Sequence, residues 1–308
     1  MIPLTYSRIA LLASGRNMRR VDLAATETNH GRRLRISVEA MFMACLMFGP
    51  AWAGQDREQG PQAAASAAQQ VDKQRTEKRQ PDVNSCSRRV AETAFLKNLW
   101  CDQKTIWSTP LSARQHLGFI LPFAGATAAL IATDKSAGRE LSERPPGAVL
   151  DASTDISHLG SAEGVIGFAG AFYGVARLTR NERMRETALL SFEALADSGI
   201  VQGLLKVTTQ RERPTQNNGQ LRIDDARGKF WSSGSSFPSG HAMSVWALAS
   251  VFASRYPDKP AVKYGACGLA ALISASRLTA RRHFPSDVLV GGVFGYLIGR
   301  YVVRAHTH

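Results

Sequence analysis

Three short blocks in the second half of the chain carry side chains that could bind and transfer a phosphoryl group. The blocks are Lys206 followed after six residues by Arg213-Pro214, then Pro238-Ser239-Gly240-His241, then Ser276-Arg277 followed by His283 and Asp287. Several cationic side chains suit an oxyanion that carries more than one charge. An aspartate close to a histidine suits an imidazole that must hold one tautomer. The residue types therefore predict a phosphoryl-binding site.

In this order and at these spacings, the blocks resemble a three-part signature. It belongs to the superfamily of type 2 phosphatidic acid phosphatases, bacterial class A acid phosphatases and vanadium haloperoxidases. The match runs from Lys206 to Asp287 with no substitution at a signature position. The resemblance implies a metal-independent hydrolase of phosphoric monoesters that works through a phosphohistidine intermediate.

The resemblance also implies a role for each signature residue. His283 would be the nucleophile, Asp287 would bind its other ring N–H, and His241 would be the general acid. The phosphate-binding residues would be Lys206, Arg213, Ser239, Gly240 through its backbone N–H, and Arg277. The resemblance implies no metal and no cofactor, and vanadate would bind as a phosphate mimic.

Helical periodicity predicts an all-α fold, because strand-like alternation is nearly absent. We expect a six-helix up-down bundle, preceded by an amphipathic helix over about 90–107. The six helices are expected at about 116–133, 156–177, 185–207, 240–255, 261–277 and 286–304. In such a bundle the ends of the third and fifth helices and the starts of the fourth and sixth share one side, which gathers the blocks.

Local signals refine the placement of the blocks. Lys206 and Arg213 are two turns apart, so one face of a helix end could present both. Ser239 is a candidate N-cap for the fourth helix, whose free N–H groups would point at an anion. Pro285 suits the first turn of the sixth helix and places Asp287 in that turn. Within the sixth helix, Gly291, Gly295 and Gly299 repeat every four residues, which predicts close helix packing.

The region before the helices predicts export. Residues 1–53 read as a signal peptide with a long leader, 54–85 as a flexible linker, and 86–308 as the helical-bundle domain. An exported chain favours a periplasmic or cell-envelope location, where a Cys86–Cys101 disulfide is plausible and two unpaired thiols remain the alternative. Cys267 lies in an apolar helix and reads as a small core residue.

Several polar residues outside the blocks have competing interpretations. Glu193 and Asp197 lie four apart on one helix face, and we favour a polar stripe or an ion pair over a metal or acid–base pair. Arg281 and Arg282 favour a solvated basic face over contact with substrate. The remaining histidines match no motif and are interpreted as structural or terminal: His116, His158, His306 and His308.

The charge balance bears on partners. The chain has 38 Lys and Arg against 25 Asp and Glu, a net charge of +13. A basic surface is attracted to phosphates or anionic lipid head groups, although a merely solvated surface is equally compatible. Nucleic acid is not expected as a partner because no recognition motif occurs. The substrate implied is a phosphomonoester or a lipid phosphate, and oligomeric state carries no sequence signal.

Two signals conflict over the membrane. The stretches 117–133 and 288–303 are nearly long and apolar enough to span, whereas Glu163, Glu193 and Asp197 interrupt the second and third helices. A cleaved signal followed by six spans would place the site on the cytoplasmic side, against the distribution of positive charge. We therefore favour a soluble periplasmic bundle with possible membrane association. The alternatives are an integral phosphatase for phosphatidate or polyprenyl diphosphate, a vanadium haloperoxidase, and a non-catalytic anion-binding protein.

Overall fold

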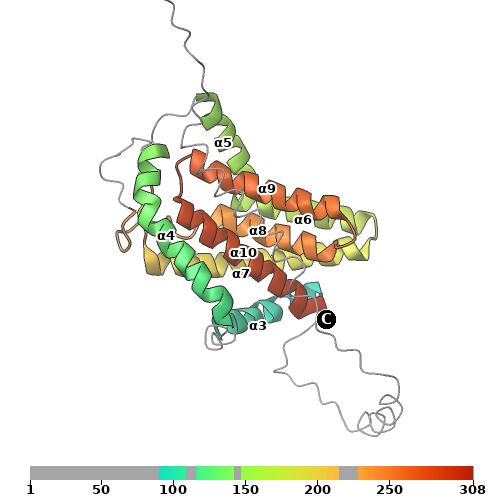
Figure 1. The fold of residues 1–308 in the computed structure, drawn as a ribbon. Helices are drawn as coiled ribbons and strands as arrows, with labels where there is room; N and C mark the ends of the chain where they lie inside the picture. Colours follow the sequence, from blue (N-terminus) through green and yellow to red (C-terminus); the bar gives the residue numbers. More distant parts are fainter. Residues whose placement is uncertain (1–89, 109–115, 142–146, 215–227, 308) are drawn as a thin grey trace, which may run out of the picture.

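Runs of helix-forming residues separated by short polar turns fold into helices throughout the described part of the chain. The computed structural model describes residues 90–108, 116–141, 147–214 and 228–307, and these ranges contain no strand. The elements are η1 (Glu92–Ala94), α3 (Phe95–Ser108), α4 (Leu117–Leu141), α5 (Gly147–Leu159), α6 (Ala162–Leu178), α7 (Glu182–Thr209), α8 (Gly240–Arg255), α9 (Pro260–Thr279) and α10 (Pro285–Thr307). The all-α prediction is confirmed (Figure 1).

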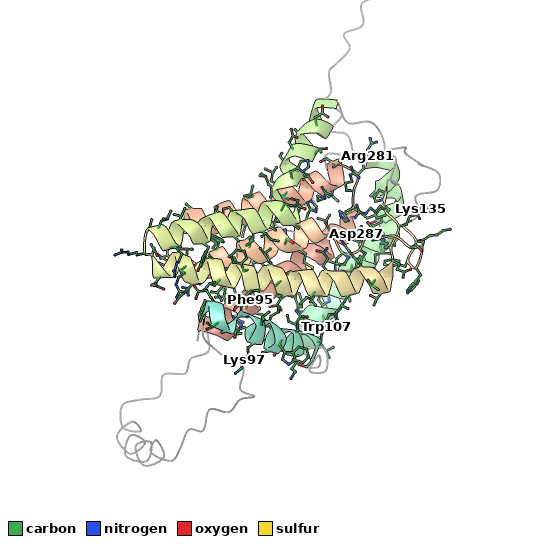
Figure 2. All side chains as sticks on the ribbon, turned by 180° about the vertical axis from the view of Figure 1, so that it is seen from behind. Phe95, Lys97, Trp107, Lys135, Arg281 and Asp287 are labelled. Carbon is green, nitrogen blue, oxygen red and sulfur yellow. The ribbon has the colours of Figure 1, made fainter. Side chains whose placement is uncertain are left out.

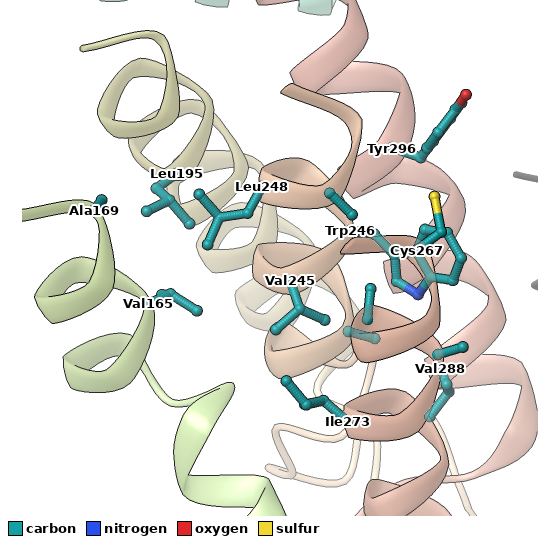
Figure 3. Packing of buried hydrophobic residues seen from close by; sticks show 14 of the residues in the cluster. Val165, Ala169, Leu195, Val245, Trp246, Leu248, Cys267, Ile273, Val288 and Tyr296 are labelled. Carbon is teal, nitrogen blue, oxygen red and sulfur yellow. The ribbon is translucent and has the colours of Figure 1, made fainter. Parts of the chain in front are cut away.

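The apolar helix α8 lies at the centre and contacts α7, α9 and α10. Most of its residues are buried, because it has apolar neighbours on several sides rather than on one face. Trp246 of α8 packs edge-on against Tyr296 of α10, with ring centroids 6.3 Å apart, and donates a hydrogen bond to Ser274 of α9. Figure 3 shows this core extending to Leu195 on α7 and Val165 on α6.

The glycine repeat in α10 permits close packing against α8, as predicted. A Cβ at Gly291 would collide with the backbone of Ser239, and one at Gly295 would collide with the backbone of Met243. A Cβ at Gly299 would meet Ser250 and the carbonyl of Ala247. The backbones of α8 and α10 therefore approach more closely than any larger residue allows, which brings the second and third blocks together.

The arrangement differs from a plain six-helix up-down bundle in its first half. The helix expected at 156–177 is divided at Gly160 into α5 and α6, which are bent by 47°. Ser161 caps α6 by accepting a hydrogen bond from the backbone N–H of Gly164 at 3.1 Å. A side chain at Gly164 would collide with the carbonyls of His158 and Leu159, so glycine permits the tight break. Helix α4 is also longer than expected and runs across α10 (Figure 1).

The predicted signal peptide (1–53) and linker (54–85) lie outside the described residues, and so does Cys86. The proposed Cys86–Cys101 disulfide therefore stays a prediction. Cys101 and Cys267 are both buried, and neither is a free thiol. Cys267 belongs to the hydrophobic core, as its apolar helix predicted.

Three helices in the described ranges are long and apolar enough to cross a membrane. They occupy Leu117–Ala137, Glu182–Thr209 and Pro285–Thr307, and α5 with α6 would add a fourth if the bent pair acts as one span. Only 6% of the apolar window in α4 is buried. An apolar helix with so little protein cover suits a lipid environment better than water.

Candidate active site

Helix ends bring the three sequence blocks to one end of the bundle. Two of the residues lie in the last turn of a helix, Lys206 in α7 and Arg277 in α9. Two others lie in the first turn of a helix, His241 in α8 and Asp287 in α10. Arg213 and His283 lie in the connections between helices. The backbone N–H of Ser239 donates to the carbonyl of Asp287 at 2.9 Å, so the second and third blocks are joined directly. Figure 2 shows Asp287 and Arg281 at this end, near Lys135 of α4.

The charged residues lie close enough to influence one another. Burial, and after it the positive charges of Arg277, Lys206 and Arg213, together lower the pKa of His241 to about 3. Burial also lowers the pKa of Arg277, to about 10, with contributions from Arg282 and Arg213. An anionic ligand bound among these cations would offset their mutual repulsion.

Three hydrogen-bond donors in this cluster are buried without a partner among the described residues. They are the hydroxyl of Ser239, the Nε of Arg213 and the Nε of Arg277. Ser239 occupies the N-cap position of α8 with extended backbone, as predicted, but its side chain makes no capping hydrogen bond. Buried donors normally find acceptors, so three unsatisfied donors beside a helix N-terminus favour an oxyanion ligand.

Arg213 reaches the cluster by a different route from the one expected. Helix α7 ends at Thr209, because Gln210 adopts a left-handed conformation (φ 44°) and its N–H donates to the carbonyl of Lys206. Lys206 and Arg213 therefore do not share one helix face. Arg213 instead lies in the connection after α7, where its guanidinium donates to the hydroxyl of Ser235 at 3.2 Å.

The surroundings of His283 determine its tautomer. Its Nδ1 lies 2.8 Å from the carbonyl oxygen of Ser236, which can only accept a hydrogen bond. Nδ1 must therefore carry the proton, which leaves the lone pair on Nε2. Burial lowers the pKa of His283, opposed by the charge of Asp287, so the ring is held neutral. A neutral imidazole with a free Nε2 is the form that can act as a nucleophile.

Asp287 is not the nearest partner of this ring, which corrects the sequence-based expectation. Its Oδ2 lies 3.7 Å from Nδ1 of His283. The carboxylate instead accepts hydrogen bonds from Arg211 at 2.5 Å, from the hydroxyl of Ser236 at 2.5 Å and from the backbone N–H of Phe284 at 2.9 Å. Asp287 thus holds the two segments that flank the ring and supplies negative charge nearby.

Sequence reasoning missed the buried network behind the histidine. The fully buried guanidinium of Arg211 forms ion pairs with Asp287 at 2.5 Å and with Asp134 of α4 at 2.7 Å. The guanidinium carbon also lies 4.8 Å from the ring centre of Phe230 and 4.6 Å from that of Phe284, in cation–π contact with both. The network attaches α4 to the site.

Weak signals for these residues were present in the chain. Arg211 stands inside the first block, two residues before Arg213, and Ser236 stands two residues before the second block. Asp134 is the first charge after the long apolar stretch of α4. None of these signals identifies a partner, because the ion pairs of Arg211 and the hydrogen bond from Ser236 to Asp287 join segments at least 51 residues apart.

The other candidates occupy different places. Arg282 is exposed and close enough to lower the pKa values of Arg213 and Arg277, which is compatible with a basic rim. His158 is exposed on α5, whereas His306 is buried at the far end of α10. His308 lies outside the described residues.

We predict that replacing Arg277 with Ala reduces kcat/KM for a phosphomonoester by roughly 100-fold or more, because the charged contact that the signature implies to the developing phosphoryl charge would be lost. Steady-state hydrolysis of a phosphomonoester measures the effect. Arg183→Ala is the matched control, since Arg183 is a surface arginine paired with Asp258. Equal kcat/KM values for the two variants would show that Arg277 does not contact the substrate.

Comparison with known proteins identifies relatives of this region. Residues 187–308 match the model of the PAP2 superfamily. Lipid A 1-phosphatase of Rhizobium johnstonii is 34% identical over 104 residues, which are 34% of this chain and 41% of the relative. Lipid A 1-phosphatase of Porphyromonas gingivalis is 33% identical over 82 residues, which are 26% of this chain and 17% of the relative. The chain thus spans less than half the length of these curated relatives.

Two solved structures resemble the fold. LpxE of Aquifex aeolicus has 22% identity and a TM-score of 0.42, and the match covers 54% of this chain and 92% of that one. A transmembrane PAP2-type phosphatidylglycerolphosphate phosphatase of Bacillus subtilis has 22% identity and a TM-score of 0.48, covering 60% of this chain and 92% of that one.

Proposed function

Because residues 187–308 belong to the PAP2 superfamily, we propose that this chain is a membrane-embedded phosphatase that hydrolyses the phosphate monoester of a lipid. The observation that carries the catalytic part is that Arg213 and Arg277, each with a buried Nε that has no partner among the described residues, lie near both His241 and the buried His283, with Lys206 also near His241. The cations would hold the phosphoryl oxygens, together with the hydroxyl of Ser239 and the backbone N–H of Gly240. Vanadate would bind here as a phosphate mimic, and no metal or cofactor takes part in the proposed reaction.

The proposed reaction has two steps. Nε2 of His283 attacks phosphorus, and the bond from phosphorus to the ester oxygen breaks as His241 gives that oxygen a proton. Water then attacks the phosphohistidine, His241 takes a proton from the water, and the phosphorus–nitrogen bond breaks to release inorganic phosphate. The carbonyl of Ser236 and the charge of Asp287 stabilise the imidazolium that develops at His283.

His241 must take up a proton from solvent when the substrate binds. With a pKa of about 3, its ring is neutral at pH 7 in the free protein. A doubly charged anion placed among the cations would offset their repulsion and raise the pKa of His241. Ligand binding would thereby convert His241 into an acid.

Sulfate binding is expected to take up about one proton near pH 6, because sulfate stays a dianion while His241 becomes protonated. Its affinity should fall by up to about tenfold per pH unit as pH rises from the free-state pKa of about 3 toward the raised pKa of the bound state, and should level off above that pKa. Calorimetry in buffers of different ionisation enthalpy measures the uptake. The uptake should vanish in His241→Gln, and its persistence there would contradict the role of His241.

The lipid part of the proposal rests on the apolar surface of α4, which reaches the site, and on further exposed apolar side chains along α6. Helix α4 is apolar and almost uncovered, yet its Asp134 belongs to the network behind His283. Large apolar side chains are exposed on α6 as well, including Phe168 and Leu178. A lipid in the same membrane could place its phosphorylated head group in the site while its acyl chains stay beside α4. The relatives described above are named as phosphatases of lipid A. This surface departs from the soluble bundle that the sequence favoured.

Membrane fractions and detergent-purified protein are expected to release phosphate from phosphorylated lipids in vesicles. The rate should exceed that with a water-soluble phosphomonoester at equal concentration, because remote apolar contacts position the lipid. The variant His283→Ala is the inactive control that measures background release of phosphate. Activity confined to a detergent-free soluble fraction would reject the membrane-embedded enzyme while retaining the phosphatase.

A further inference from the structure

A second buried polar cluster lies away from the phosphate-binding end. It consists of Asp102 on α3, Glu193 in the middle of α7 and His306 in the last turn of α10. One ligand atom from each residue lies within 4.8 Å of the others, and all three residues are buried. Figure 1 shows α3 beside the C-terminal end of α10, where this cluster forms.

The three ligand atoms are oriented toward one another. Nε2 of His306 lies 2.8 Å from Oδ2 of Asp102 and 3.8 Å from Oε2 of Glu193. The Glu193 side chain is only 1% exposed, and its Oε2 has no hydrogen-bond partner among the described residues. Burying a carboxylate oxygen without a hydrogen-bond donor costs free energy, so a bound cation at this atom would be stabilising.

Surrounding side chains hold the remaining carboxylate oxygens. Asn98 donates to Oε1 of Glu193 at 2.9 Å, and Tyr301 donates to Oδ1 of Asp102 at 3.1 Å. Each carboxylate is thus anchored through one oxygen, while its other oxygen faces His306. Supporting hydrogen bonds of this kind are typical of the outer shell of metal sites.

The charge of the cluster also favours a cation. Within the described ranges, His306 is the only basic residue that pairs with Asp102 or Glu193. A third buried carboxylate, Asp197, lies one turn further along α7 and accepts from Gln103 at 2.7 Å. A single imidazole supplies at most one positive charge to these three buried carboxyl groups, and a bound cation would let them release their protons and act as ligands.

We propose that Asp102, Glu193 and His306 bind one divalent transition metal ion, with Zn²⁺ fitting the set of one nitrogen and two oxygen ligands. In a tetrahedral zinc site, ligand atoms at about 2.1 Å from the metal lie about 3.4 Å apart. The separations of 2.8 and 3.8 Å from His306 bracket that value, and the two carboxylate oxygens lie within 4.8 Å of each other. Small side-chain shifts would complete the geometry, with water in the fourth position.

The proposed ion has a structural role separate from phosphoryl transfer. Asp287 and His306 stand near opposite ends of α10, about 28 Å apart at the rise of an α-helix. The ion would join α3 to α7 and α10. Helix α3 buries few apolar side chains of its own, because its buried residues are Asn98, Cys101 and Asp102. A zinc site could not be predicted from the spacing of these residues, because the three ligands come from distant segments of the chain.

The test uses the full chain in detergent without a histidine tag, stripped with EDTA and then equilibrated with Zn²⁺. We expect about one zinc per chain by mass spectrometry of the metal, and a midpoint of thermal unfolding about 5–10 °C higher at a hundredfold excess over Kd. Co²⁺ in place of Zn²⁺ should give the visible absorption of a four-coordinate site. No bound zinc and no cobalt spectrum in the wild-type chain would overturn the proposal.

Glu193→Gln keeps the shape of the side chain and removes the charge. It should weaken zinc binding by more than the roughly 10–100-fold that loss of an outer-shell partner costs, and should remove the effect of EDTA on unfolding. Glu182→Gln is the matched control on the same helix, at a side chain that is 71% exposed. Equal zinc content in both variants would also overturn the site, and the wild-type cobalt spectrum decides if Glu193→Gln does not fold.

Discussion

Replacing His283 with Ala is expected to abolish phosphate release, by about 10⁴-fold or more in kcat. The loss follows from the geometry, because no other described histidine has its Nδ1–H held by a backbone carbonyl so that Nε2 stays unprotonated beside the same cations. Phosphate release from a lipid phosphate in detergent measures the effect. His158→Ala, at an exposed histidine on α5, should retain wild-type activity.

Trapping the intermediate separates a nucleophilic role from a structural one. Rapid quenching with a labelled substrate should give an acid-labile, base-stable phosphoenzyme in the wild type and none in His283→Ala. With a substrate that carries a good leaving group, His241→Ala should accumulate the phosphoenzyme, since the first step no longer needs an acid and the second lacks its base. Labelling of His283→Ala to the wild-type level would contradict the proposed nucleophile.

Arg211→Met is expected to destabilise the fold by about 3–5 kcal/mol, because it leaves two buried carboxylates, Asp134 and Asp287, without their cation. Both ion pairs are at most 3% exposed, so water cannot replace the guanidinium. The free energy of unfolding in detergent measures the change. Activity should fall as well, since Asp287 and Ser236 lose their common anchor behind His283.

Two comparison variants define this expectation. Arg255→Met removes a partly exposed arginine that pairs with Glu186, and should cost about 1 kcal/mol or less. Adding Asp134→Asn to Arg211→Met should recover part of the stability by removing one unpaired charge. Similar losses in Arg211→Met and Arg255→Met would show that the buried network does not stabilise the protein.

The helices were predictable because their cause is local. Apolar periodicity located α7, α8, α9 and α10 to within a few residues, and Pro285 marked the start of α10. The division of the second helix at Gly160 was missed, since a single glycine is tolerated inside many helices. The turn at Ser161 becomes visible only when its cap and the close contacts of Gly164 are known.

The sequence by itself determined which residue types could bind and transfer a phosphoryl group, because their spacing places them on helix ends that share one side of a bundle. Tertiary structure alone decided the partners of the buried groups. Ser236 rather than Asp287 lies nearest to Nδ1 of His283, and Arg211 joins Asp287 to Asp134. The physical reason is that a buried charge must be compensated by whatever neighbours packing supplies, and those neighbours are distant in the chain.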